Sequence, residues 1–197
     1  LNLLNHDGYR RKFIDTFCLV AGSVFEPTRA NAIIDELLAV VKPMTDLMKQ
    51  QGIRDGHDPE SAASDIKTKL KGRSNKMTDF MQKFAPMDLK NTKKQTVELS
   101  TNTEGASLYV NGLEVPYAAF NGHLFGPVTL EAKAPASYVF NGWRESANSG
   151  DVISKEAVMD LPEDSKLTLV ACFEPLSDTQ RMTEGITPVR INEVSAA

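Results

Sequence analysis

Histidine is the side chain most often used for acid–base and metal chemistry near neutral pH, and this sequence has three of them, His6, His57 and His123. A zinc site needs three or four ligands at about 2.0–2.3 Å from the metal. The three histidines are far apart in the sequence, and no histidine or cysteine spacing suggests a ligand set. We therefore expect solvated loop histidines and no metal site.

The stretch DGHDPE has the acidic, glycine-containing look of a calcium loop. An EF-hand loop needs oxygen ligands at alternate positions and a distal bidentate glutamate. Asp55 and Asp58 are three residues apart, which fits that pattern poorly. A helix-capping turn at Asp58 is the better interpretation.

The stretch KTKLKGRSNK gathers five cations, and its two interpretations are a phosphate or nucleic-acid patch and an ordinary solvated face. At helical spacing these side chains spread around the cylinder, and no aromatic residues interleave for base stacking. We expect a solvated face or a contact with another acidic part of the protein, and no nucleic-acid partner. The cations are Lys67, Lys69, Lys71, Arg73 and Lys76.

Aromatic residues in the second half are the candidate ligand-binding residues. Trp143, Tyr138 and Tyr109 could form a platform that stacks on a sugar, which requires exposed rings. Alternating aromatics in a short β-module more often supply its core, since each buries about 150–250 Å². The core interpretation is favoured, and these three residues stay the candidates for a carbohydrate or host-ligand site.

Motifs for covalent or phosphate chemistry are absent from the sequence. There is no G-x-S-x-G elbow, and no G-x-x-x-x-G-K-[ST] or G-x-G-x-x-G loop that would cradle a phosphate. Cys18 and Cys172 lie in apolar stretches, so we expect two buried free thiols. The sequence predicts no catalytic, cofactor-binding or metal-binding residue.

Helical periodicity governs residues 1–92. Apolar residues recur every three or four positions, first over residues 9–24 and then over residues 33–48, which predicts amphipathic helices. Asp7 is a candidate N-cap, Gly22 should loosen the end of the first helix, and Pro43 should kink or divide the second. Asp58-Pro59 opens a third helical stretch that Gly72 interrupts and Pro86 ends. We expect a small bundle of three or four helices. The second helix should bury the following residues: Ile33, Ile34, Leu37, Leu38, Val41, Met44 and Met48.

From residue 95 the period changes to two. Short runs of β-branched and aromatic residues alternate over 95–175, with Asn-Gly turn signals at 111–112, 121–122 and 141–142, the last of which could equally be a bulge. This predicts a small antiparallel β-module, either a sandwich or a β-grasp-like sheet. The fold class is therefore α+β with segregated parts. Residues 176–188 read as a linker, and residues 189–197 read as the first strand of a further, truncated domain.

Charge divides the chain at the same boundary. Residues 1–94 hold 16 of the 22 Lys and Arg residues and 12 of the 26 Asp and Glu residues, so the second half carries the negative net charge. No apolar run approaches the ~20 residues of a membrane-spanning helix. The abrupt beginning and end lead us to expect an internal piece of a longer protein.

The helical half resembles the carboxy-terminal helical part of the spore coat protein H (CotH) kinase-like family. The similarity covers about residues 4–89 and lies in YRRKFIDTF, the FEPTR junction, IIDELLAVVKPMTDLM and Arg73 before MTDFMQKF. The loop around QQGIRDGHDPESAAS lacks the tryptophans expected there. The second half, with Tyr138, Phe140, Gly142-Trp143 and Phe173, is similar to internalin-type β-repeats, and VRINEVSAA looks like the first strand of a lamin-tail-like domain.

These resemblances imply an exported bacterial surface protein whose ATP- and Mg²⁺-binding lobe precedes these helices. The chain would then be a non-catalytic fragment that supports the lobe, with the β-module as a spacer or adhesion element. One alternative is a carbohydrate- or host-ligand-binding module centred on Trp143. The other is that the helices form one wall of the substrate groove of an atypical kinase.

Overall fold

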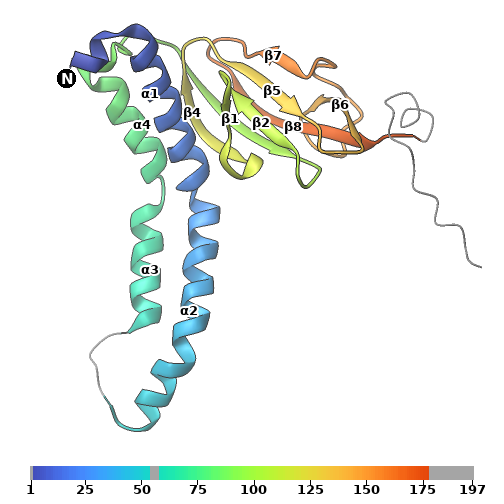
Figure 1. Ribbon diagram of the computed structural model, residues 1–197. Coiled ribbons are helices and arrows are strands. Elements are labelled where there is room, and N and C mark those ends of the chain that lie inside the picture. The colour runs from blue at the N-terminus through green and yellow to red at the C-terminus, as the bar shows by residue number, and fades with distance from the viewer. Residues whose placement is uncertain (1, 54–57, 178–197) are drawn as a thin grey trace, which may run out of the picture.

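The computed structural model describes residues 2–53 and 58–177. Helices occupy the first half of the chain and two four-stranded sheets the second half, which confirms the predicted α+β class with segregated parts (Figure 1). The helical elements of the first half, in chain order, are η1 (Asn2–Asn5), α1 (Asp7–Leu19), η2 (Val20–Val24), α2 (Pro27–Gln50), α3 (Pro59–Leu70), α4 (Arg73–Lys83) and η3 (Ala85–Met87), and a short η4 (Pro116–Ala118) lies among the strands.

Local signals set most of the helix ends. Pro27 occupies the first position of α2, where its missing N–H costs nothing, and the Glu26 carboxylate accepts a hydrogen bond from the Arg29 N–H. Asp58 caps α3 by accepting from the Ser61 N–H at 3.3 Å, as predicted. Gly72, with φ of 66°, separates α3 from α4, which also confirms the prediction.

Three expectations for the helices have different outcomes. Asp7 is the first residue of α1 instead of its cap, and its carboxylate pairs with Arg10 at 2.6 Å. Pro43 does not divide α2, which runs unbroken from Pro27 to Gln50, but the axis of α2 bends in its second half, which matches the kink alternative (Figure 1). Gly22 lies in η2, where the end of the first helix changes from an α-helix to a π-type turn.

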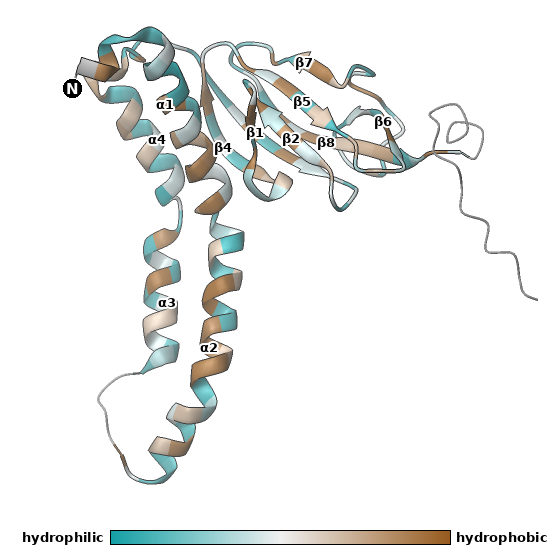
Figure 2. Ribbon diagram, in the orientation of Figure 1, coloured by the Kyte–Doolittle hydropathy of each residue, from teal (hydrophilic) through white to brown (hydrophobic). Residues whose placement is uncertain are grey.

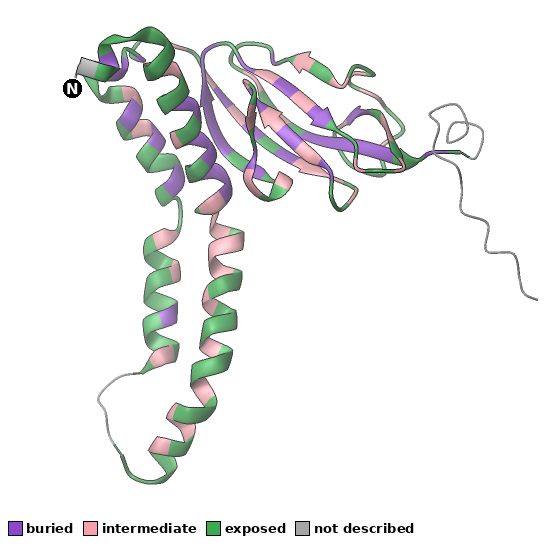
Figure 3. Ribbon diagram, viewed as in Figure 1, coloured by how far each residue is buried: buried purple, intermediate pink, exposed green. Residues whose placement is uncertain are grey.

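The helices α2 and α3 form an antiparallel hairpin, called here the arm, which extends away from the sheets (Figure 1). Ion pairs join the two helices: Lys42 Nζ lies 2.7 Å from Glu60 Oε1, and Lys67 pairs with Asp35. No residue of α2 is buried (Figure 3). The expectation that its apolar residues form a buried face was therefore wrong, since α3 covers only one side of the helix.

The remaining helical elements α1, η2 and α4 pack against strand β4 (Phe120–Phe125). Gly22 approaches the Phe120 ring so closely that a Cβ at residue 22 would lie 2.3 Å from Phe120 Cε2. The base of the arm is held by Arg29, whose guanidinium carbon lies 3.7 Å from the centroid of the Tyr117 ring.

The strands form two sheets with the orders β4-β1-β8-β6 and β3-β2-β5-β7. Every pair is antiparallel except β1–β8, which is parallel, so the β-module is not wholly antiparallel as expected. The sheets share one apolar core, as in a sandwich (Figure 1). The strands are β1 (Lys94–Thr101), β2 (Ser107–Val110), β3 (Leu113–Glu114), β4 (Phe120–Phe125), β5 (Thr129–Lys133), β6 (Tyr138–Arg144), β7 (Val158–Asp160) and β8 (Lys166–Pro175).

The three Asn-Gly pairs have three different outcomes. Asn111 and Gly112 have φ of 50° and 76° and form the tight turn between β2 and β3, as predicted. Asn121 and Gly122 lie inside β4, so the turn expected there was wrong. At residues 141–142 the β6–β8 register shifts, which matches the bulge alternative.

One apolar core continues from the helices into the sandwich. Ile14, Cys18 and Leu19 of α1 belong to the same buried cluster as Phe120 and Leu124 of β4. Cys18 and Cys172 are both buried free thiols, as predicted. The division into domains 1–92 and 95–175 stays a prediction, and residues 178–197, which include the expected truncated strand, lie outside the described residues.

Candidate functional site

The three aromatic candidates do not come together. Trp143 has 0% of its surface exposed and packs edge-on against Phe140 with ring centroids 5.8 Å apart. Tyr138 is 37% exposed at the start of β6, whereas Tyr109 lies in the other sheet beneath Lys133 Nζ, 4.1 Å from its ring centroid. The hypothesis of a sugar platform centred on Trp143 is therefore corrected: Trp143 is a core residue, because its ring has no exposed face.

Of the two histidines that the structure describes, His123 is the one placed differently from expectation. It lies within β4 and is buried, and its Nδ1 is 3.1 Å from Thr78 Oγ1 and 3.5 Å from the Asp79 carboxylate. Burial lowers the pKa of His123, and Lys94 adds to this effect, while Asp79 opposes it. His6 is exposed before α1, and His57 lies outside the described residues. In the ranges 2–53 and 58–177 no three His, Cys, Asp or Glu side chains gather as a metal site.

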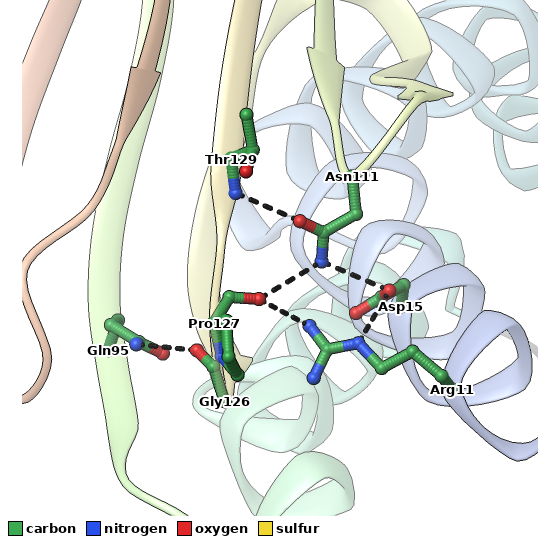
Figure 4. Close-up of polar contacts among 7 residues, drawn as sticks. All are labelled: Arg11, Asp15, Gln95, Asn111, Gly126, Pro127 and Thr129. Atoms are coloured by element: carbon green, nitrogen blue, oxygen red, sulfur yellow. Dashed lines mark hydrogen bonds and ion pairs between the residues drawn. The ribbon is translucent and has the colours of Figure 1, made fainter. Parts of the chain in front are cut away.

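A buried carboxylate joins α1 to the sandwich (Figure 4). Asp15 Oδ2 accepts hydrogen bonds from Arg11 Nε at 2.9 Å and from Asn111 Nδ2 at 3.1 Å. Arg11 Nη2 also donates to the Pro127 carbonyl at 2.9 Å, and the Asn111 side-chain oxygen accepts from the Thr129 N–H at 2.9 Å. The network therefore holds the β2–β3 turn, the β4–β5 loop and α1 in one position.

Burial raises the pKa of Asp15, and the neighbouring Arg11 and Asn111 partly offset that rise. A raised pKa in a hollow can mark a catalytic acid. Here the carboxylate oxygen already holds two donors from the chain itself, and no nucleophilic side chain is among its hydrogen-bonding partners. The arrangement suits a structural joint better than proton transfer.

A larger feature is an exposed apolar surface around α1, η2 and α4, called here the basal patch. Phe17, Val20, Phe25, Leu70 and Met77 line an open cavity of about 300 Å³. The Phe13 and Phe17 rings stack with centroids 6.3 Å apart. The basal patch comprises Phe13, Phe17, Val20, Phe25, Met77, Phe80 and Phe84.

Helical spacing explains why these side chains are exposed. On α4, Met77 and Phe80 share one side, and Phe84 directly follows the last residue of the helix. The buried residues Thr78 and Met81 point to the sheet. Phe80 is 65% exposed, Phe25 58% and Phe84 48%. Sequence periodicity predicted an apolar stripe over residues 9–24 but assigned it to the interior of a bundle.

A second exposed apolar stripe runs along α2 and is called here the arm seam. Its members are separated by four, three, four and three residues, and the hydropathy colouring of α2 shows apolar bands along the whole arm (Figure 2). Val40 is 77% exposed, Met44 62% and Leu37 61%. The arm seam comprises Ile33, Leu37, Val40, Met44 and Leu47.

The basic stretch beside the cavity is solvated, with one exception. Lys67 pairs with Asp35 across the arm. Lys69, Lys71, Arg73 and Lys76 are exposed and form no ion pair with another described residue. Of these cations, Arg73 is among the residues that line the apolar cavity.

Compared with known proteins, the chain matches no family model, no curated protein and no solved structure. The similarities to CotH-like, internalin-type and lamin-tail-like chains therefore stay predictions. Within the described part of the chain, no helix is both long and apolar enough to cross a membrane.

Proposed function

We propose that this chain is a non-catalytic interaction module whose helical half docks onto another protein unit through the basal patch. The β-sandwich then serves as a spacer or adhesion element that the Asp15 network holds in a fixed orientation to the docking face. The observation that carries the proposal is the cavity of about 300 Å³ between η2 and α4, with large apolar side chains exposed around it.

The size and composition of the basal patch support a protein partner. Single exposed apolar residues are normal on protein surfaces, but contiguous patches of more than a few hundred Å² mark interaction sites. If a fully exposed large apolar residue presents roughly 200 Å², the basal patch presents on the order of 500 Å². Interface energy concentrates where aromatic anchors fill pockets, and the cavity would accept one large side chain of the partner.

We propose that the partner is a unit that precedes these helices in the same protein. Element η1 contacts both α1 and η3, so the amino end lies beside α1 and α4 (Figure 1). The resemblance to CotH-like proteins leads us to propose a kinase-like lobe there, which would bind ATP and Mg²⁺ and use these helices as a support or as one wall of its substrate groove. An exported, cell-surface location is part of the same proposal.

Two measurements test this function. Titration of the chain with ATP and Mg²⁺ should give no binding, and micromolar binding would contradict a non-catalytic role. The reading frame upstream of Leu1 should then be expressed together with the chain, and amide hydrogen exchange compared with that of the chain alone. We expect slower exchange in α1 and α4 of the longer protein.

A matched pair of variants assigns that protection to the basal patch. Phe80→Lys places a charge on the exposed apolar face of α4, whereas Asn75→Lys places the same charge on an exposed residue of the same helix outside that face. Phe80→Lys should abolish the protection and Asn75→Lys should keep it. Equal exchange in the long and short proteins, or equal effects of the two variants, would contradict docking at this surface.

A further inference from the structure

The arm seam is separate from the basal patch and has the spacing of a two-stranded coiled coil. Alternating separations of four and three residues are those of the a and d positions of a heptad. The residues that directly follow Ile33, Leu37 and Leu47 are half-buried. Successive residues are about 100° apart around a helix, so the seam residues point in a different direction from this half-buried stripe. The half-buried stripe includes Leu38, one turn before Lys42, which pairs with Glu60 of α3. The arm seam therefore lies on a face that α3 leaves uncovered.

We infer that α2 is a dimerisation helix and that the arm seam is covered by the arm seam of a second copy of this chain, with the two helices antiparallel. In this pairing Leu37 lies opposite Val40 of the second copy, and Ile33 lies opposite Met44. The inference goes beyond the proposed function, because the interface and its occupant differ from those of the basal patch.

The composition of the arm seam favours a second copy of itself. Antiparallel pairing places a positions opposite d positions, and all five seam residues are apolar, so no charge or polar group is buried without a partner. The two-fold axis of this alignment falls between residues 38 and 39, which is the middle of α2 (Pro27–Gln50). Leu47 then lies opposite Ala30, which is also apolar. Seam residues pair with seam residues over 33–44, and over that stretch the surface is self-complementary, as a two-fold interface requires.

The area is sufficient for a reversible dimer. With roughly 200 Å² for a fully exposed large apolar residue, the exposures of 39–77% give on the order of 600 Å² for each seam and about 1,200 Å² for the pair, the lower end of stable interfaces. We therefore expect a dissociation constant in the micromolar range.

The shape of the chain favours the antiparallel orientation. The sandwich lies at the amino end of α2 and the arm extends freely from it (Figure 1). Parallel pairing would bring two sandwiches together at one end, whereas antiparallel pairing separates them by the length of α2, about 36 Å for 24 residues. Antiparallel helices also align their macrodipoles favourably.

Analytical ultracentrifugation of the chain and of two variants tests the dimer. Val40→Lys places a charge in the centre of the arm seam, and Ala39→Lys places the same charge on the neighbouring exposed residue, outside the seam. The wild-type chain and Ala39→Lys should dimerise with rising concentration, and Val40→Lys should weaken dimerisation at least tenfold with an unchanged circular dichroism spectrum. A chain that stays monomeric up to about 100 µM, or a dimer that Val40→Lys does not weaken, would overturn the inference.

Disulfide formation tests the orientation. In the antiparallel dimer, residue 33 of one copy lies beside residue 44 of the other, whereas the two residues 33 lie about 16 Å apart, too far for a disulfide. A mixture of Ile33→Cys and Met44→Cys should therefore cross-link, and Ile33→Cys alone should not. Cross-linking of Ile33→Cys alone would show a parallel dimer and overturn the proposed pairing. The native Cys18 and Cys172 are 1% and 4% exposed and should not react.

Failure of the dimer proposal is distinguishable from failure of the proposed function. The basal patch experiments use Phe80 and Asn75, which belong to α4 and are absent from the arm seam. A monomeric chain would leave docking at the basal patch intact, and a dimer would form whether or not an upstream unit exists.

Discussion

Replacing Gly22 by alanine should destabilise the protein because the helices and the sandwich meet at this residue. A Cβ at residue 22 would lie 2.3 Å from Cε2, 2.7 Å from Cδ2 and 2.9 Å from Cζ of the Phe120 ring. Phe120 is 2% exposed and belongs to the core cluster, so the ring has little room to move. The substitution must therefore separate η2 from β4 or displace the ring.

The expected magnitude follows from two opposing effects. Inserting a methyl group into a well-packed core costs about 1–3 kcal/mol, whereas replacing glycine by alanine in a helical segment gains about 0.5–1 kcal/mol. The net loss should be about 1–2 kcal/mol, which lowers the melting temperature by roughly 3–6 °C for a protein of this size. Gly8→Ala is the matched control, because nothing lies within 4 Å of a Cβ at residue 8 in α1.

Denaturant unfolding followed by circular dichroism and by tryptophan fluorescence measures both variants. The first signal reports mainly the helices, and the second reports Trp143, the only tryptophan of the chain. Gly22→Ala should lower the free energy of unfolding and Gly8→Ala should leave it unchanged or raise it. A Gly22→Ala protein at least as stable as Gly8→Ala would show that η2 does not pack on Phe120 as described.

Three further predictions concern the core and the polar contacts. Asp15→Ala leaves Arg11 and Asn111 without their shared acceptor. The free energy of unfolding, measured by thermal unfolding, should fall by about 1–3 kcal/mol. A smaller decrease would mean that water replaces the carboxylate. Burial lowers the pKa of His123, so as the pH falls the unfolded chain takes up a proton on this residue before the folded chain does. The wild type should therefore lose stability relative to His123→Gln as the pH falls through the ordinary histidine range. Parallel profiles of stability against pH for the two proteins would contradict this. Trp143 fluorescence should be blue-shifted, protected from acrylamide and unchanged by glycans, and a red-shifted, quenchable signal would restore the sugar-platform interpretation.

Sequence reasoning predicted those features that short-range chemistry determines. Asp58 and Gly72 set helix boundaries through capping and φ preference within a few residues, and Asn111-Gly112 makes a tight turn for the same reason. Asn121-Gly122 carried the same signal but lies inside β4, where the β1–β4 ladder and the close approach to Gly22 dominate over the turn preference.

Features that depend on distant parts of the chain could not be predicted. The parallel β1–β8 pair joins residues about 70 positions apart, and the Asp15–Asn111 contact joins residues 96 positions apart. Periodicity located the apolar stripe of α2 but could not tell whether the rest of the described chain covers it. The same limit applies to Phe80 and Phe84, whose exposure only the packing of α4 on β4 reveals.

Amide hydrogen exchange of the chain at several protein concentrations would test whether the apolar faces of the helices are binding surfaces. Below the dimerisation range, α2 should exchange much faster than β1 and β8, because none of its residues is buried. As the concentration rises, protection should increase in α2 while the strands stay unchanged. The proposal that the arm seam binds a second copy would be contradicted if α2 were as protected as the core strands at every concentration. It would also be contradicted if the protection of α2 did not change with concentration.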